Sequence, residues 1–231
     1  MNNPDAISGE SQSSRASSRL EEWQAITIGT IAGFVDAYGM MTYSTYLSFM
    51  SGNTTQTGSE IGKGNFSLAL PAAFAIASFV CGSFAGAFVS DPKSQGTRRM
   101  IFAAVAALLA LVIGFAKLGA IPEAAHIAVA SFAMGALNTA FTRVGAQQVG
   151  LTFVTGTLSR FGVHLASALR RRPVANSEGP WDTHLRRALL LGGIWMGFLV
   201  GALLSGFATP LFGVWVLLFP IFVLALLAGL A

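Results

Sequence analysis

Several separate runs of roughly 20 apolar residues are the feature that most constrains how this chain can fold. A helix rises 1.5 Å per residue, so about 20 residues cross the ~30 Å of hydrocarbon in a bilayer. The chain is 53% hydrophobic and 10% charged, whereas soluble domains carry about 25% charged residues. Because a helix satisfies its own backbone hydrogen bonds in lipid, the pattern predicts an all-α polytopic membrane bundle.

We expect about six transmembrane helices in the chain. They are predicted at 24–46, 67–90, 99–119, 124–142, 187–207 and 211–230. Arg160 and His164 interrupt a seventh apolar segment at 149–169, which we interpret as interfacial or partly inserted. Residues 1–22 contain six serines and few apolar residues, a composition typical of disorder, so a disordered cytoplasmic tail is expected before a single transmembrane domain at 23–231.

The distribution of basic residues predicts the orientation of the chain. With the N-terminus placed in the cytoplasm, 12 of the 14 Lys and Arg residues fall on the cytoplasmic side, leaving Lys63 and Lys117 outside. Positive residues are retained on the cytoplasmic side of membrane proteins. Both termini are therefore predicted to lie on the cytoplasmic side of an inner membrane. This rule also accounts for the net charge of +4 without nucleic acid, which we do not expect as a partner.

An internal repeat divides the chain into halves at about 23–120 and 121–231. Segments 49–58 and 153–162 share the pattern F-x-[ST]-G, followed six residues later by Gly. Span one matches span four at an offset of 102 residues, which pairs Asp36 with Asn138. Small residues of span two, Ser78, Gly82, Gly86 and Ser90, match Gly193, Gly197, Gly201 and Ser205 of span five at an offset of 115.

Each half has three predicted spans, so the second half enters the membrane from the opposite side, giving inverted repeats. The small residues at every fourth position form stripes that allow close helix packing. These stripes fit contacts within one chain and contacts across a homodimer equally well.

Asp36 is the only acidic residue deep within a predicted span. A carboxylate there costs several kcal/mol unless it is paired or solvated. Two interpretations follow: a proton or cation site, or a hydrogen-bonded group that joins helices, for example to Asn138.

The two polar motifs are the other candidate binding elements. They supply Ser51, Gly52, Asn53 and Thr54 in the first half, and Thr155, Gly156 and Thr157 in the second. In transporters, such segments interrupt helices so that freed backbone groups bind a substrate or ion. The alternative is helix capping by the hydroxyl and amide side chains.

Glu60 and His164 occupy equivalent positions in the two motif regions and are weaker candidates for a proton relay. Glu123 and His126 have the E-x-x-H spacing of a di-iron ligand pair, but the chain has no second copy of this motif, so no metal site is predicted. We find neither a nucleophile motif nor a P-loop, and we expect no catalytic residues, no cofactor and no enzyme activity.

The residues 33–37 (GFVDA), the S-G-N-T-T motif at 51–55, Asn138 and the T-G-T motif at 155–157 resemble the YoaK-like bacterial inner-membrane proteins, a family of unknown function. The resemblance covers about residues 25–230, with Ser51 where the family pattern leads us to expect Thr. It implies six spans and no established substrate.

From the residues themselves we predict a transporter or channel for a small solute or ion, with a midplane site around Asp36. The alternatives are a non-catalytic membrane partner or scaffold and, less favoured, a membrane enzyme. Besides the lipid bilayer, the expected partner is thus a small solute or ion of unknown identity.

Overall fold

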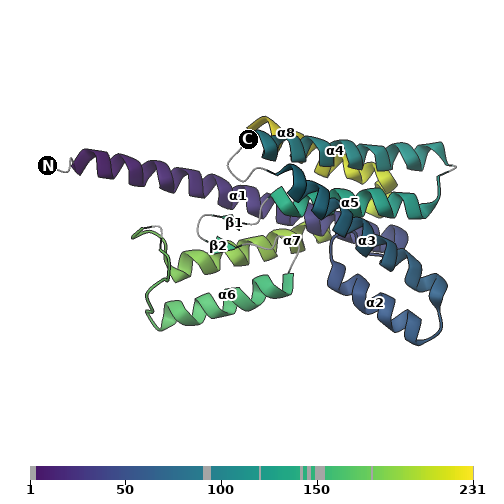
Figure 1. Ribbon diagram of the computed structural model, residues 1–231, viewed down its shortest axis with the longest axis horizontal. Coiled ribbons are helices and arrows are strands. Elements are labelled where there is room, and N and C mark those ends of the chain that lie inside the picture. The colour runs from purple at the N-terminus through teal and green to yellow at the C-terminus, as the bar shows by residue number, and fades with distance from the viewer. Residues whose placement is uncertain are drawn as a thin grey trace.

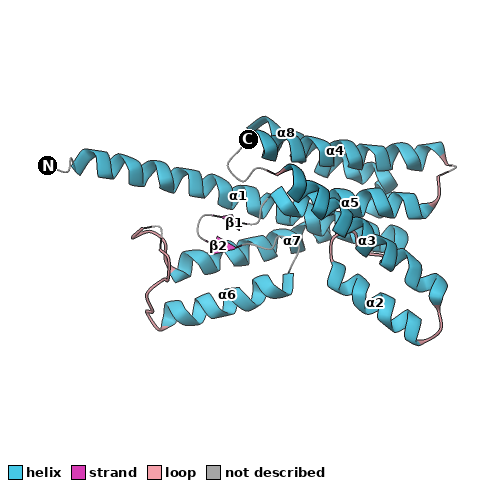
Figure 2. Cartoon of the chain, viewed as in Figure 1, coloured by secondary structure: helices cyan, strands magenta, loops and turns pink. Residues whose placement is uncertain are grey.

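The computed structural model describes residues 4–90, 95–119, 121–140, 143–144, 147–148, 154–177 and 179–230, with side chains from Arg19 onward outside 95 and 143–148. The chain is a bundle of α-helices (Figures 1 and 2). In order they are α1 (Pro4–Tyr43), α2 (Met50–Gly62), α3 (Phe66–Val89), α4 (Gln95–Leu118), α5 (Glu123–Ala140), α6 (Val154–Leu169), α7 (His184–Phe212) and α8 (Leu218–Leu230). Two-residue strands β1 (Arg143–Val144) and β2 (Gln147–Gln148) pair between α5 and α6.

Each of the six predicted spans overlaps a helix, although the predicted span 211–230 covers the end of α7, a 3₁₀-helix and α8, which has only 13 residues. Four segments are long and apolar enough to cross a membrane by length and composition: Arg19–Tyr43, Phe66–Val89, Gly96–Leu118 and His184–Leu230. The last segment contains both α7 and α8, and α5 has only 18 residues. α1 is helical from Pro4, so its start does not coincide with the predicted boundary at residue 22, and the disordered tail stays a prediction.

Two short helices lie where hydropathy predicted loops or an interfacial segment. α2 packs against α3, and α6 packs against α7. Figure 1 shows α2 and α6 at opposite ends of the bundle, each beside its long partner. The part of segment 149–169 that precedes Val154 lies outside the described residues.

The arrangement of small and large side chains on α3 indicates whether water or lipid surrounds this helix. Its buried face carries Ala72, Ala75 and Gly82, whereas Phe84 and Phe88 are 71% and 80% exposed. A soluble helix would bury its large apolar residues, but a helix in lipid gains nothing by hiding them and places small residues at helix contacts. This distribution agrees with a membrane-spanning bundle.

The glycine stripes mediate contacts within one chain. α1 crosses α7 and α3 crosses α5, and these are the two most extensive helix contacts in the bundle. A Cβ atom on Gly33 would overlap the backbone carbonyl of Phe198, and one on Gly135 would overlap that of Phe79. The absence of a side chain is therefore what lets the two backbones touch.

The same two crossings also carry the reciprocal contacts, from the glycine of the partner helix. A Cβ atom on Gly201 would overlap the carbonyl of Thr30, and one on Gly82 would overlap that of Phe132. The equivalent contacts are separated by 102 residues in α1 and α5, and by 119 residues in α3 and α7. The first offset is the predicted one, whereas the second exceeds the predicted 115 by four residues, about one helical turn.

The chain reverses between α7 and α8 through the 3₁₀-helix η1 (Gly213–Leu217). Gly213 has φ of 56°, a left-handed conformation that glycine adopts without steric cost. α8 then returns along α4 (Figure 1).

Candidate functional site

Asp36 is buried within α1, with 2% of its surface exposed, and binds the segment that precedes α2. Its Oδ1 atom accepts hydrogen bonds from the backbone N–H groups of Leu47 (2.9 Å), Ser48 (2.6 Å) and Phe49 (3.2 Å). Its Oδ2 atom accepts a hydrogen bond from Ser48 Oγ at 2.7 Å. The carboxylate therefore has four donors from three consecutive residues.

These bonds fix the segment that leads into α2. The backbone donors belong to Leu47, Ser48 and Phe49, which precede the first helical residue, Met50. Phe49, at the cap position, makes no side-chain capping bond. Asp36 therefore anchors the turn before α2 from α1, and its negative charge is favourable beside the positive end of the α2 dipole. The hydrogen-bonded interpretation of Asp36 thus fits its surroundings, with the 47–49 backbone as its partner.

The turn between α1 and α2 is also held from the α2 side. Asn53 is fully buried, and it both accepts a hydrogen bond from Tyr46 N (3.1 Å) and donates one to Tyr46 O (2.7 Å). Gln56 Nε2 donates to Ser44 O at 3.1 Å, and Ser44 has φ of 52°. Asn53 therefore closes the turn, which accounts for the amide in the S-G-N-T-T motif.

A cavity of about 390 Å³ lies beside this turn. Elements of both halves of the chain line it: α1, the 46–49 turn, and the starts or middles of α6 and α7. Its lining residues are Gly33, Asp36, Ala37, Met40, Met41, Tyr46, Phe49, Val154, Thr155, Phe198 and Ala202. The wall is mostly apolar and aromatic, with a few polar groups, as is typical of small-molecule sites.

The structure brings only part of the predicted site together at this cavity. Asp36 and Thr155 line it. Ser51 and Thr54 are exposed on α2, where the Thr54 hydroxyl donates to Met50 O. Thr157 is buried within α6, at a position equivalent to Asn53.

Gly52, Gly156 and Asn138 are not among the residues that line this cavity. Gly52 is packed against aromatic rings, since a Cβ atom there would lie 2.6 Å from Phe49 and 3.0 Å from Tyr46. Asn138 is partly buried and has a partner of its own.

Glu60 and His164 lie away from the cavity lining. Glu60 accepts hydrogen bonds from Lys63 (2.8 Å) and Asn65 (2.9 Å), and the hydrogen bond from Lys63 is the main cause that lowers the pKa of its carboxyl. His164 Nδ1 lies 2.8 Å from His184 Nδ1, joining α6 to the start of α7. Burial, followed by the charge of His184, lowers the pKa of His164.

His126 joins α5 to the end of α1 rather than pairing with Glu123. Its Nδ1 atom lies 3.2 Å from the Tyr43 hydroxyl, which lies 3.1 Å from that of Tyr38. Within the described ranges, no group of three or more His, Cys, Asp and Glu side chains could hold a metal ion.

Sequence reasoning missed most of the cavity wall. Tyr46, Met40 and Met41 read as ordinary residues at a span end, Phe49 was marked only as part of the repeated segment, and Phe198 belongs to another helix far along the chain. Only the turn geometry and the crossing of α1 with α7 place them around one space. A buried acidic residue about a dozen positions before a polar segment is the one signal that could have indicated the anchored turn before α2.

A bundle whose large apolar side chains face outward, with polar groups buried inside, defines an integral, multi-pass membrane protein. The chain matches a family model, described as protein of unknown function (DUF1275), over residues 24–230, and it belongs to this family. It is 31% identical over 180 residues to the UPF0700 transmembrane protein RA0705 of Rhizobium meliloti (strain 1021). The matched region covers 77% of this chain and 71% of the relative. No solved structure matches it. The resemblance to a membrane family of unknown function is thus confirmed.

Proposed function

We propose that the protein is a secondary transporter or channel for a small solute or ion, and that the cavity beside Asp36 is its binding site. The observation that carries the proposal is the position of this cavity, which is lined by α1 and the 46–49 turn from one half and by α6 and α7 from the other. Transporters built from internal repeats bind their substrates at such interfaces.

The proposal includes six spans arranged as two inverted halves. The α1–α7 and α3–α5 crossings support it, because equivalent glycines contact equivalent carbonyls in both. The two short helices support it as well, since α2 packs on α3 as α6 packs on α7. In this arrangement α1 to α4 correspond in order to α5 to α8.

The orientation is part of the same proposal: both termini lie in the cytoplasm of a bacterium, and the chain resides in the inner membrane. The excess of Lys and Arg in the predicted cytoplasmic segments supports this orientation. Reporter fusions test it, because a reporter after Gly64 should be active outside and one after Arg172 inside. Opposite results would overturn the inverted arrangement.

In this proposal, Asp36 couples the binding of a proton or cation to solute access. A proton or cation that binds its carboxylate competes with the N–H donors of 47–49 for the same oxygen atoms. Weakening these bonds loosens the turn that forms one wall of the cavity. Occupancy of Asp36 and access to the cavity are then linked through the position of α2.

The test begins with a thermal-shift screen of the purified protein against small solutes and ions. A solute that stabilises the protein is then followed into reconstituted vesicles, with and without an imposed pH gradient, for the wild type and Asp36→Asn. We expect gradient-driven uptake by the wild type and its loss in Asp36→Asn, with the exposed Ser51→Ala variant as control. Normal coupled uptake by Asp36→Asn would exclude Asp36 as the coupling residue, and uptake no faster than in protein-free vesicles would exclude transport.

A non-catalytic membrane partner or scaffold is the second candidate. The burial of Asp36, together with the four bonds it accepts from its own chain, favours this function, because a carboxylate that holds a turn needs no ligand. The cavity distinguishes the two candidate functions, because a transporter needs a solute-binding cavity and a scaffold does not.

A further inference from the structure

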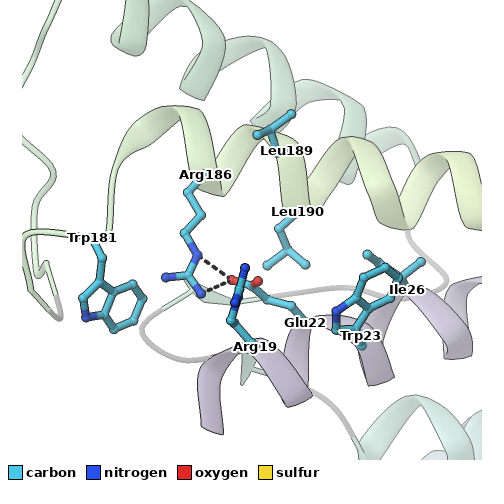
Figure 3. A pocket seen from close by; sticks show the side chains of 8 residues that line it. All are labelled: Arg19, Glu22, Trp23, Ile26, Trp181, Arg186, Leu189 and Leu190. Carbon is cyan, nitrogen blue, oxygen red and sulfur yellow. Dashed lines mark hydrogen bonds and ion pairs between the residues drawn. The ribbon is translucent and has the colours of Figure 1, made fainter. Parts of the chain in front are cut away.

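A second cavity, of about 380 Å³, lies between residues 19–26 of α1 and the beginning of α7 (Figure 3). It is polar at one end, where Arg19, Glu22 and Arg186 meet, and apolar along Ile26, Leu189 and Leu190. Arg19 and Ile26 are seven residues apart on α1, which places about 10 Å between the charged and apolar ends. The cavity therefore has the polarity gradient of the boundary between lipid headgroups and hydrocarbon.

The arginine from α7 is fixed in place. Arg186 binds Glu22 Oε1 through its Nε (2.9 Å) and Nη2 (2.8 Å) atoms. Its guanidinium also lies over the Trp181 ring, 4.2 Å from the centroid. Figure 3 shows these two partners on different sides of the Arg186 side chain. A guanidinium held by a carboxylate and an aromatic ring keeps its positive charge in a fixed position at the polar end of the cavity.

Arg19 supplies the uncompensated charge of this cavity. It precedes Glu22 by three residues, so both side chains lie on one face of α1. Among the residues whose side chains are described, no carboxylate forms an ion pair with Arg19. Two guanidinium groups and one carboxylate leave a single net positive charge, which matches the single negative charge of a phosphodiester.

We propose that this cavity binds an anionic phospholipid, with the phosphate between Arg19 and Arg186 and an acyl chain along Ile26 and Leu189. Guanidinium groups bind phosphate oxygens through paired hydrogen bonds. Trp23 and Leu189 are 69% and 66% exposed at the rim, and Trp is enriched where headgroups meet hydrocarbon. These exposed apolar groups favour a lipid over free phosphate as the ligand. The site is independent of the proposed transport function.

The test measures lipid binding by the purified full-length protein in detergent. Thermal stability is followed as phosphatidylglycerol, zwitterionic phosphatidylcholine or sodium phosphate is added. We expect a shift with phosphatidylglycerol alone. A hydrogen-bonded contact between charged groups contributes about 1.5 kcal/mol or more, so Arg19→Gln should weaken the apparent affinity by roughly tenfold or more.

Two further variants make the outcome specific. Arg19→Lys keeps the charge and should retain the preference for phosphatidylglycerol, whereas Arg170→Gln removes an exposed arginine outside the cavity and should change nothing. An equal response to phosphatidylcholine or to sodium phosphate would overturn the proposal. So would an equal loss of affinity in Arg170→Gln and Arg19→Gln.

Discussion

Gly201→Ala is expected to force α1 and α7 apart at their closest approach. The new methyl group would overlap the backbone carbonyl of Thr30, and its next neighbour is the backbone N of Phe34. Backbone atoms cannot rotate out of the way as a flexible side chain can. The helices would have to separate by more than about 1 Å to restore an ordinary van der Waals distance, which sacrifices contacts along the crossing.

Overpacking of this kind costs about 1–3 kcal/mol. Alanine also favours a helix over glycine by up to about 1 kcal/mol, and this gain would mask part of the cost. Gly206 provides a matched control, because it lies in the same helix and a Cβ atom there would have no neighbour within 4 Å. The difference between Gly201→Ala and Gly206→Ala isolates the packing cost, because the helix-propensity gain is common to both.

Thermal unfolding in detergent, followed by intrinsic fluorescence, measures this difference. For a chain of this length, 1 kcal/mol corresponds to about 2–4 °C, so Gly201→Ala should melt roughly 2–12 °C below Gly206→Ala. Gly82→Ala, at the equivalent crossing of α3 with α5, should behave like Gly201→Ala. Equal melting temperatures for Gly201→Ala and Gly206→Ala would refute the close-contact account.

Two further predictions concern the turn before α2 and the histidine pair. Ser48→Ala removes one hydrogen bond to Asp36 and should lower stability by about 1–3 kcal/mol, with faster amide exchange at 47–49. The exposed Ser51→Ala should have neither effect, and unchanged exchange in Ser48→Ala would contradict the anchoring of the turn by Asp36. Because burial and His184 lower the pKa of His164, the folded chain binds protons less readily than the unfolded one. Stability should therefore be full above pH 6.5 and fall as the pH decreases through the folded pKa, with His164→Gln reducing this slope in thermal unfolding; identical slopes would contradict it.

The long apolar helices could be predicted because lipid imposes a length on them, and that length is visible in a single sequence. α3, at Phe66–Val89, begins and ends within one residue of the predicted 67–90. Which helix its small-residue face contacts could not be predicted. Its glycines contact α5 in the structure, a choice of partner that the small-residue stripe alone leaves open.

α2 could not be predicted as a helix because its stabilising contact is not local. Its sequence is polar and contains three glycines, and Phe49 provides no capping side chain at its start. The turn that leads into it is held by Asp36, which lies on a different helix. The repeat drew attention to 49–58, yet it indicated Asn138 as a partner of Asp36, whereas the bonds of Asp36 run to residues 47–49.

The central claim is that the cavity beside Asp36 is a solute site reached by water. Thr155→Cys, in a Cys81→Ala background, places a thiol on the cavity wall, and a charged, membrane-impermeant thiol reagent reports whether water reaches it. Phe207→Cys is the control, because Phe207 is 77% exposed on the protein and is expected to face lipid. In intact vesicles the account predicts labelling of Thr155→Cys from at least one side and none of Phe207→Cys. Labelling of Thr155→Cys only after the protein is unfolded would contradict it.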